Sequence, residues 1–383
     1  MKIVVRTFAG FEEILADEIF QITNVKAEIG KRAVYLDGDL EIIYSLNLWC
    51  RLALEVLVEL HNYKASNEDE LYNGAYEFIW DNEFSIHETF SISSVVNSPF
   101  FNHSKYASLK IKDAIADQFN KKYGKRPSVD RDNPDHKFLV RISHDQVNLL
   151  WNTSGDPLFK RGYRKMTGVA PLNEVLAAGI IKFSRWDFKR PLIDPMCGSG
   201  TFLCEALMIA RNIPPSVERK NFGFTKHKNY DHALWTTIKN KANEKKNENK
   251  PVLMGYDNLN EMIIATRNNI NNIDSNNDCK ITFKDFFDLE PPVDNPFLIL
   301  NPPYNMRIAQ EKNHMFYQKI GSRLKHSWSG SDAWILSGDL EGLKHIGLRP
   351  IRKIKLFNGP IETKLVHIPL YKGSKKIKGN KIG

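Results

Sequence analysis

The fold is decided by residues 191–201, PLIDPMCGSGT, which join an apolar strand, a glycine turn and the start of an apolar helix. Gly198 and Gly200 allow the backbone to turn tightly and to approach a ligand closely. The helix that follows, predicted over residues 201–212, offers unpaired N–H groups at its N-terminus. This strand–turn–helix order predicts a nucleotide-binding loop at the end of a sheet strand.

Two common phosphate-binding motifs do not match this loop. The dinucleotide motif G-x-G-x-x-G needs a glycine three residues after Gly200, where Leu203 stands. The chain also contains no G-x-x-x-x-G-K-[ST] motif, which disfavours a P-loop nucleotidase. The loop is therefore expected to bind a ligand other than a pyrophosphate.

Strands and helices alternate on the C-terminal side of the loop. Apolar stretches predict strands at residues 252–257, 279–285, 296–301 and 332–338, with helices near 260–271 and 313–324 and a final hairpin around Asn358-Gly359. Such alternation predicts an open, largely parallel α/β sheet with one antiparallel strand, in a domain of residues 170–383. The polar stretch 213–250 is interpreted as an insertion in this domain with a disordered or helical tip.

The N-terminal part reads as two smaller α+β modules, residues 1–64 and 65–155, followed by a basic linker at 156–169. Residues 1–98 have a net charge of −10, whereas the remainder of the chain has +19. A basic surface of this size favours a polyanion such as RNA as partner, although such lysines are also common on solvated helix faces. The candidate RNA-binding cations are Lys105, Lys110, Lys121, Lys122, Lys125, Arg126, Arg161 and Arg164.

Acidic residues follow three predicted strands in succession. Asp194 suits a ligand with an ammonium group, and Asp257 can accept hydrogen bonds from both ribose hydroxyls. Asp285 and Phe286 can bond an adenine amino group and cover its ring. Ammonium, ribose and adenine without phosphate describe S-adenosylmethionine, the cofactor that this pattern predicts.

The fourth predicted strand ends in Asn301-Pro302-Pro303-Tyr304. The Asn301 side-chain oxygen and the Pro302 carbonyl can accept the two N–H groups of an exocyclic base amine and orient its lone pair. Tyr304 offers a ring on which an extruded base can stack. No cysteine occupies this loop, which disfavours methylation at pyrimidine carbon 5 through a covalent adduct. The motif predicts amine methylation.

Composition restricts the setting of this chemistry. The longest apolar runs are too short to span a bilayer, and MKIVVRT is no secretory signal. The four cysteines show neither CxxC pairs nor metal-ligand spacing. We therefore expect a cytoplasmic protein without disulfides, a metal site or a membrane partner.

The sequence resembles the THUMP-domain class I RNA methyltransferases, in particular the bacterial enzymes that methylate guanine N2 in 23S ribosomal RNA. The likeness runs through GFEEILADEI, RPSVDRDNPD, LFKRGYR, APLNEVLAAGII, DPMCGSGTFLCEA and NPPYNMRI. It implies a Rossmann-like methyltransferase sheet with an antiparallel C-terminal hairpin strand, preceded by α+β ferredoxin-like and THUMP modules that hold structured RNA. The chain departs from the family at Asn305, where glycine is usual, and at residues 151–153, where an acid is common.

The resemblance also implies roles for individual residues. It places Asn301, Pro302 and Tyr304 in the catalytic loop. It also assigns a second group of residues to cofactor binding. Those are Pro171, Asn173 and Glu174, the loop residues Asp194, Gly198, Ser199, Gly200 and Thr201, and Asp257 and Asp285. Pro195, Cys197 and Phe286, with Asn301 shared, complete the predicted cofactor site.

NPPY alone does not select the substrate, because several nucleobases carry an exocyclic amine. Guanine N2 in 23S ribosomal RNA is the expected target. Guanine N2 in transfer RNA and adenine N6 in RNA or DNA fit the same catalytic logic. A catalytically silent RNA-binding or ribosome-assembly factor is the alternative from a different class.

Overall fold

The computed structural model describes residues 1–166, 171–303 and 310–372. The chain divides into two compact units, which are described separately. The first contains Met1–Thr7, Phe11–Lys160 and Pro214–Glu244, and the second contains Phe8–Gly10, Arg161–Ile213 and the chain from Lys245 onward. No helix among the described residues is long and apolar enough to cross a membrane.

The first unit is built on a seven-stranded mixed sheet with strand order β2-β3-β1-β4-β7-β6-β5. Only β5 and β6 pair in parallel, and the other neighbours are antiparallel. The two predicted N-terminal modules share this sheet, because β4 of the first module pairs with β7 of the second. The strands are β1 (Lys2–Arg6), β2 (Glu28–Gly30), β3 (Ala33–Asp37), β4 (Glu55–Lys64), β5 (Phe90–Asn97), β6 (His136–Ser143) and β7 (Gln146–Asn152).

Helices of the first unit follow local sequence signals. Leu15 and Ile19 of α1 recur at helical spacing and are fully buried. The Asn67 side chain caps α3 by accepting the Glu70 N–H, and Gly124 ends α4 in the left-handed conformation (φ +68°). The helical segments are α1 (Glu12–Thr23), α2 (Leu40–Trp49), α3 (Glu68–Glu77), η1 (Trp80–Asn82), α4 (Ser104–Tyr123), η2 (Gly223–Lys226) and α7 (His232–Glu244).

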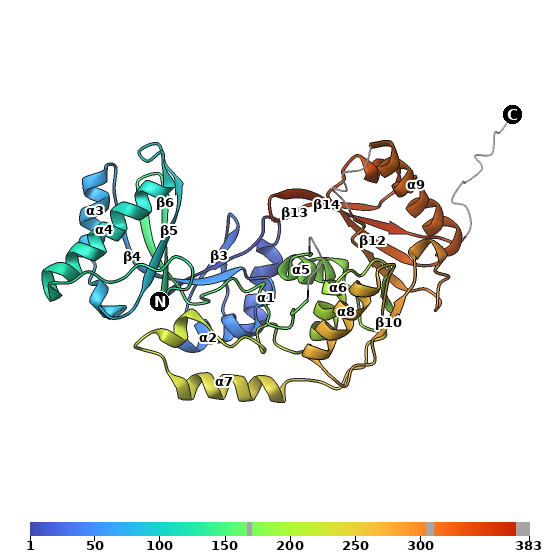
Figure 1. Ribbon diagram of the computed structural model, residues 1–383, viewed down its shortest axis with the longest axis horizontal. Helices are drawn as coiled ribbons and strands as arrows, with labels where there is room; N and C mark the ends of the chain where they lie inside the picture. Colours follow the sequence, from blue (N-terminus) through green and yellow to red (C-terminus); the bar gives the residue numbers. More distant parts are fainter. Residues whose placement is uncertain (167–170, 304–309, 373–383) are drawn as a thin grey trace. The chain divides into compact units, whose positions relative to one another are not determined.

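Residues 214–244 interrupt the second unit in the sequence, as expected of an insertion, but they do not pack within that unit. Pro214–Glu244 folds with the first unit, where α7 packs beside α2 although the two are far apart in the sequence (Figure 1). The buried side chains of α7 are Trp235, Ile238 and Ala242, which share one helix face. The polar composition of the stretch conceals this narrow apolar face, which is why the sequence did not predict that the helix packs against α2.

The second unit contains a seven-stranded sheet with the order β10-β9-β8-β11-β12-β14-β13. The first five strands are parallel, whereas β14 is antiparallel to β12 and forms a hairpin with β13. The predicted open sheet with an antiparallel C-terminal hairpin is confirmed. The strands are β8 (Leu192–Asp194), β9 (Leu253–Asp257), β10 (Lys280–Phe283), β11 (Phe297–Leu300), β12 (Asp332–Ser337), β13 (Arg352–Asn358) and β14 (Ile361–Pro369).

Helices cover both faces of this sheet. Consecutive strand residues point to opposite faces. Met254 of β9 belongs to a buried cluster with Tyr317 and Ile320 of α9, whereas a Cβ at the next residue, Gly255, would meet Leu203 of α6. The helical segments are α5 (Glu174–Ser184), α6 (Thr201–Ala210), α8 (Asn260–Ile273), η3 (Phe286–Asp288), α9 (Gln310–Ser327) and η4 (Gly342–Ile346).

The strand order reverses between β8 and β11, which are neighbours in the sheet. In open α/β sheets the crevice for a ligand lies outside the carboxyl ends of the strands at such a reversal. The glycine loop follows β8 and Asn301 follows β11, so the two predicted site motifs lie on either side of this point.

Candidate active site

Side chains from neighbouring elements fix the backbone of the glycine loop. The Gly198 N–H donates to Asp257 Oδ2 (2.8 Å), and the Thr266 hydroxyl donates to the Gly198 carbonyl (2.7 Å). Gly200 has φ +81°, and a Cβ there would lie 2.6 Å from Thr266 Cγ2. Glycine is therefore required at position 200 both by backbone conformation and by the close approach of α8.

Thr266 and Asn269 of α8 are positioning residues that the sequence analysis missed. Both are fully buried, and the Asn269 side-chain amide donates to the Ser199 carbonyl (3.0 Å). The sequence signal that could have identified these two residues is their spacing, because polar side chains three residues apart lie on the same face of a helix. On a buried face such side chains need hydrogen-bond partners. A backbone hydrogen bond also holds the glycine loop in place, because the Cys197 N–H donates to the Tyr256 carbonyl (2.9 Å).

Asp194 lies at the end of β8 and is 2% exposed. Its carboxyl accepts the Met196 N–H at 3.2 Å. Burial raises the pKa of Asp194 well above its ordinary range; the bond from Met196 opposes the shift, and the charge of Asp257 adds to it. A cationic group beside this carboxyl would favour its charged form, which suits the ammonium group predicted from the sequence.

The two remaining strand-end acids are held by local bonds. Asp257 Oδ1 accepts the Leu259 N–H (3.0 Å), while Asp285 accepts the Phe287 N–H (2.8 Å) and the Asn258 side-chain amide (2.9 Å). Because β9 and β10 are parallel neighbours, both acids lie at the same edge of the sheet as Asp194.

Phe286 does not take the predicted place over an adenine ring. Its side chain is 2% exposed, belongs to a buried cluster and stacks on Trp328 with ring centroids 6.2 Å apart. Core packing therefore accounts for this ring, and the predicted contact is corrected.

The segment before α5 meets the basic linker at a buried ion pair. Asn173 caps α5 by accepting the Val175 N–H (2.9 Å), whereas Pro171 is exposed. Burial raises the pKa of Glu174 to about 7 despite the opposing charge of Arg164, whose Nε lies 3.2 Å from the carboxylate. Arg164 also donates to the Thr201 hydroxyl (2.7 Å) at the start of α6.

Arg161 and Arg164 were predicted to contact RNA phosphate, and the structure gives them another role. Arg161 is 1% exposed and pairs with the buried Glu205 of α6, with Nε–Oε1 3.3 Å. The Arg164 side chain is 10% exposed. These cations are enclosed by the second unit, so they attach the linker segment to α5 and α6 instead of facing a polyanion.

Asn301 directly follows β11 at the carboxyl edge of the sheet. Its side-chain oxygen is buried and has no hydrogen-bond partner among the described residues. Pro302 is buried and Pro303 is exposed, while Tyr304 and Asn305 lie outside the described residues. The result is an unsatisfied acceptor at the point where the strand order reverses.

The candidate RNA-binding cations of α4 and the turn after it fall into two groups. Lys110, Lys122 and Arg126 form ion pairs with Glu68, Asp81 and Asp117, respectively. The side chains of Lys105, Lys121 and Lys125 have no acidic partner among the described residues. The second group is more available to a polyanion.

Comparison with known proteins places this site in a family. Residues 161–367 match the model of the RMKL-like methyltransferase domain. The chain belongs to the RMKL-like methyltransferase family. Residues 65–151 match the THUMP domain, and residues 2–57 match the RlmL ferredoxin-like domain. These matches confirm the resemblance to THUMP-domain class I methyltransferases.

Relatives resemble the chain over most of its length. It is 35% identical to a Shewanella frigidimarina protein named ribosomal RNA large subunit methyltransferase K/L, over 92% of this chain and 50% of that protein. It is also 35% identical to slr0064 of Synechocystis sp., provisionally named an RNA methyltransferase, over 94% and 95% of the two chains. The chain thus spans about half the length of the K/L relatives that it matches.

Among solved structures, SMU.472 is similar over the whole chain. This provisionally named methyltransferase was crystallised with S-adenosylhomocysteine. The two chains are 27% identical, with a TM-score of 0.84 over 97% of this chain and 99% of the other.

Proposed function

We propose that this protein is an S-adenosylmethionine-dependent RNA methyltransferase that modifies the exocyclic N2 of a guanine in 23S ribosomal RNA. The observation that carries the proposal is the buried Asn301 oxygen, which lacks a partner among the described residues. An unsatisfied buried acceptor costs about 1–3 kcal/mol, and a bound N–H donor would remove that cost. The exocyclic amine of a base supplies such a donor.

The residues of the second unit fit S-adenosylmethionine. Asp194 would offer its buried carboxyl to the ammonium group, while Asp257 and Asp285, at the ends of the next two strands, would bind the ribose and the adenine amino group. In the glycine loop, a Cβ at position 198 would have no atom within 4 Å, so Gly198 leaves space for close approach of the ligand. When bound, the cofactor supplies a methyl group attached to a positively charged sulfur.

The catalytic contribution of Asn301 is positional and electrostatic. An amine conjugated with a purine ring is a weak nucleophile because its lone pair is delocalised. Hydrogen bonds from the amine to Asn301 Oδ1 and the Pro302 carbonyl would favour a pyramidal nitrogen and direct the lone pair away from both oxygens. Asn301 is neutral, so it acts as an acceptor and not as a general base.

Two observations support RNA, and ribosomal RNA in particular, as substrate. The chain contains a THUMP domain, and the K/L relatives are named for ribosomal RNA of the large subunit. The family model and the unpartnered acceptor also favour an enzyme over a catalytically silent RNA-binding factor.

The test incubates the protein with S-adenosylmethionine labelled on the methyl group and with separate pools of 23S, 16S and transfer RNA. Mass spectrometry of the digested nucleosides should detect N2-methylguanosine in the 23S pool. Methyladenosine as the sole product would contradict the guanine assignment, and label confined to transfer RNA would contradict the ribosomal one. Absence of cofactor binding in calorimetry at millimolar ligand would favour the silent factor.

A further inference from the structure

The first unit contains a cavity of about 260 Å³ whose lining includes none of the predicted site residues. It lies where the chain before η2 meets α7, and Leu48 of α2 contributes to its wall. The polar and aromatic residues that line it are Ser216, Arg219, Lys220, Phe222, Trp235, Lys239 and Asn243. None of the described residues in its lining is acidic.

Ser216 supplies an unsatisfied hydrogen-bonding group in the cavity wall. The residue is 1% exposed, and its hydroxyl has no partner among the described residues. Its backbone is fixed by a bond from its N–H to the Leu48 carbonyl. A buried hydroxyl of this kind requires a partner from a ligand or from water.

Two lysines give the cavity a positive charge. Lys220 and Lys239 have no acidic partner within ion-pair distance in the described parts of the chain. The Lys239 ammonium lies 5.5 Å from the centroid of the Trp235 ring. This cation–π contact is favourable, and it leaves the positive charge of the lysine uncompensated. A lining that contains a hydroxyl group and two cations but no acidic residue matches an anionic oxygen ligand.

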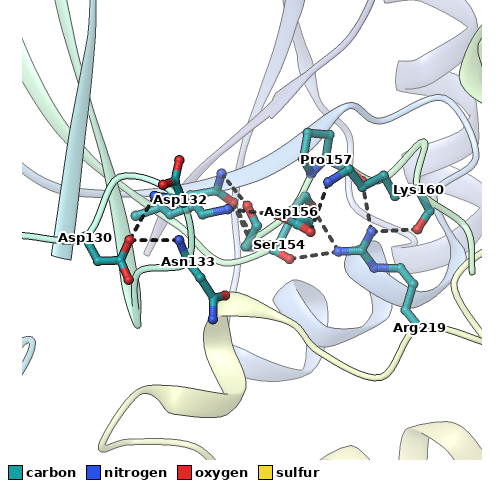
Figure 2. Close-up of polar contacts among 11 residues, drawn as sticks. Asp130, Asp132, Asn133, Ser154, Asp156, Pro157, Lys160 and Arg219 are labelled. Carbon is teal, nitrogen blue, oxygen red and sulfur yellow. Dashed lines mark hydrogen bonds and ion pairs between the residues drawn. The ribbon is translucent and has the colours of Figure 1, made fainter. Parts of the chain in front are cut away.

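The wall that carries Ser216 and Lys220 is held in place by Arg219. Its guanidinium donates hydrogen bonds of 2.9–3.1 Å to backbone carbonyls of the turn after β7 (Figure 2). The accepting oxygens belong to Ser154, Asp156, Pro157 and Lys160. Phe222, which lies 5.1 Å from the guanidinium, packs against Trp235. The cavity is therefore built on a fixed backbone and a packed aromatic core.

We propose that this cavity binds a backbone phosphate of the RNA substrate, a proposal that rests on the RNA methyltransferase function proposed above. Its volume is below the ~300–1,000 Å³ of typical small-molecule sites, so it suits a phosphate with part of its sugar. The three groups that contact the phosphate are the Ser216 hydroxyl and the ammonium groups of Lys220 and Lys239. Through them the first unit fixes the position of the RNA backbone without reading its sequence.

The test measures binding of a fluorescently labelled 23S ribosomal RNA transcript to the full chain at several salt concentrations. K220Q/K239Q should reduce the slope of log affinity against log salt by about 1, because one phosphate contact is lost. S216A should weaken binding about two- to tenfold without changing the slope, because a neutral hydrogen bond is lost.

The matched control is K228Q/K241Q, which removes the same charge from exposed lysines of the same segment that do not line the cavity. An equal change of slope in both double variants would overturn the proposal in favour of a general electrostatic field. Calorimetry with S-adenosylmethionine should give the same affinity for all variants, and circular dichroism spectra and unfolding midpoints like those of the wild type would confirm that the first unit is folded.

The remaining outcomes separate this proposal from the proposed function. Normal RNA binding by K220Q/K239Q, with the wild type also binding, would overturn the cavity proposal alone. Failure of the wild type to bind RNA would overturn both. Saturable binding of guanosine monophosphate that K220Q/K239Q abolishes, with RNA affinity unchanged, would assign the cavity to a free nucleotide and overturn the RNA proposal.

Discussion

The glycine loop after β8 and the chain after β11 lie side by side in the sheet but differ in how their polar groups are used. In the loop, Asp257, Thr266 and Asn269 hold the backbone, and the buried linker arginines support the helices next to it. After β11, the Asn301 oxygen is buried without a partner among the described residues. The chain therefore fixes the backbone of the glycine loop by itself, whereas the substrate side presents an acceptor that a ligand can satisfy.

This contrast predicts that substitutions of buried polar residues on the cofactor side reduce the stability of the second unit. Arg161→Met should leave the Glu205 carboxylate buried and unpaired, which costs about 3–5 kcal/mol. Urea unfolding followed by circular dichroism should show a lower midpoint for the second unit. The double variant R161M/E205L removes both charges and should recover most of the loss. Unchanged stability of R161M would contradict a structural role for this pair.

Damage on the substrate side should instead reduce the rate. Asn301→Ala should lower the methyl transfer rate by about 10²–10³-fold, or about 2.7–4 kcal/mol, if the lost acceptor resembles an oxyanion-hole group. The affinity for S-adenosylmethionine and the unfolding midpoint should stay near those of the wild type. A matched loss of stability would mean that Asn301 has a structural role, and an unchanged rate would exclude it from catalysis.

The positions of both motifs could be predicted from the sequence, because each directly follows a short apolar strand. Residues 194, 257, 285 and 301 do lie at one edge of a parallel sheet. The burial of the linker arginines could not be predicted, because the distribution of charge along the sequence does not reveal that Glu205 and Glu174 lie in the interior as their partners. The packing of α7 on α2 was missed for a related reason: three apolar residues in a polar helix give a weak signal.

Asp194 differs from the other acids on the cofactor side, because its carboxyl is buried without a cation among the described residues to stabilise its charged form. Burial raises its pKa, so its carboxyl takes up protons more readily than an exposed one. A bound cation favours the carboxylate, so cofactor binding should release a proton. Cofactor affinity should therefore fall as the pH decreases through this pKa, by at most about tenfold per pH unit.

Calorimetry at a series of pH values above the ordinary pKa of an aspartate, in buffers of different ionisation enthalpy, would measure this proton release. The stability of the cofactor-free protein should change in the opposite direction. A carboxyl whose pKa is raised on folding stabilises the protein at low pH, and this stabilisation is lost as the pH rises through the raised value. Asp194→Asn should remove both dependences while weakening the cofactor, and a proton release that persists in this variant would assign it elsewhere.

The same distinction between partnered and unpartnered groups applies to the cations near the end of α4, where the smallest effect is expected. Lys122 and Arg126 pair with Asp81 and Asp117, whereas Lys121 and Lys125 have no acidic partner among the described residues. K121Q/K125Q should lower the salt slope of RNA binding by up to about 2, because each available cation can neutralise one phosphate. K122Q/R126Q removes the same net charge, but the two cations that it removes already form ion pairs with carboxylates. The salt slope of RNA binding should therefore change less in this variant. Equal slopes for the two variants would mean that net charge, and not the availability of each side chain, controls RNA binding at this helix.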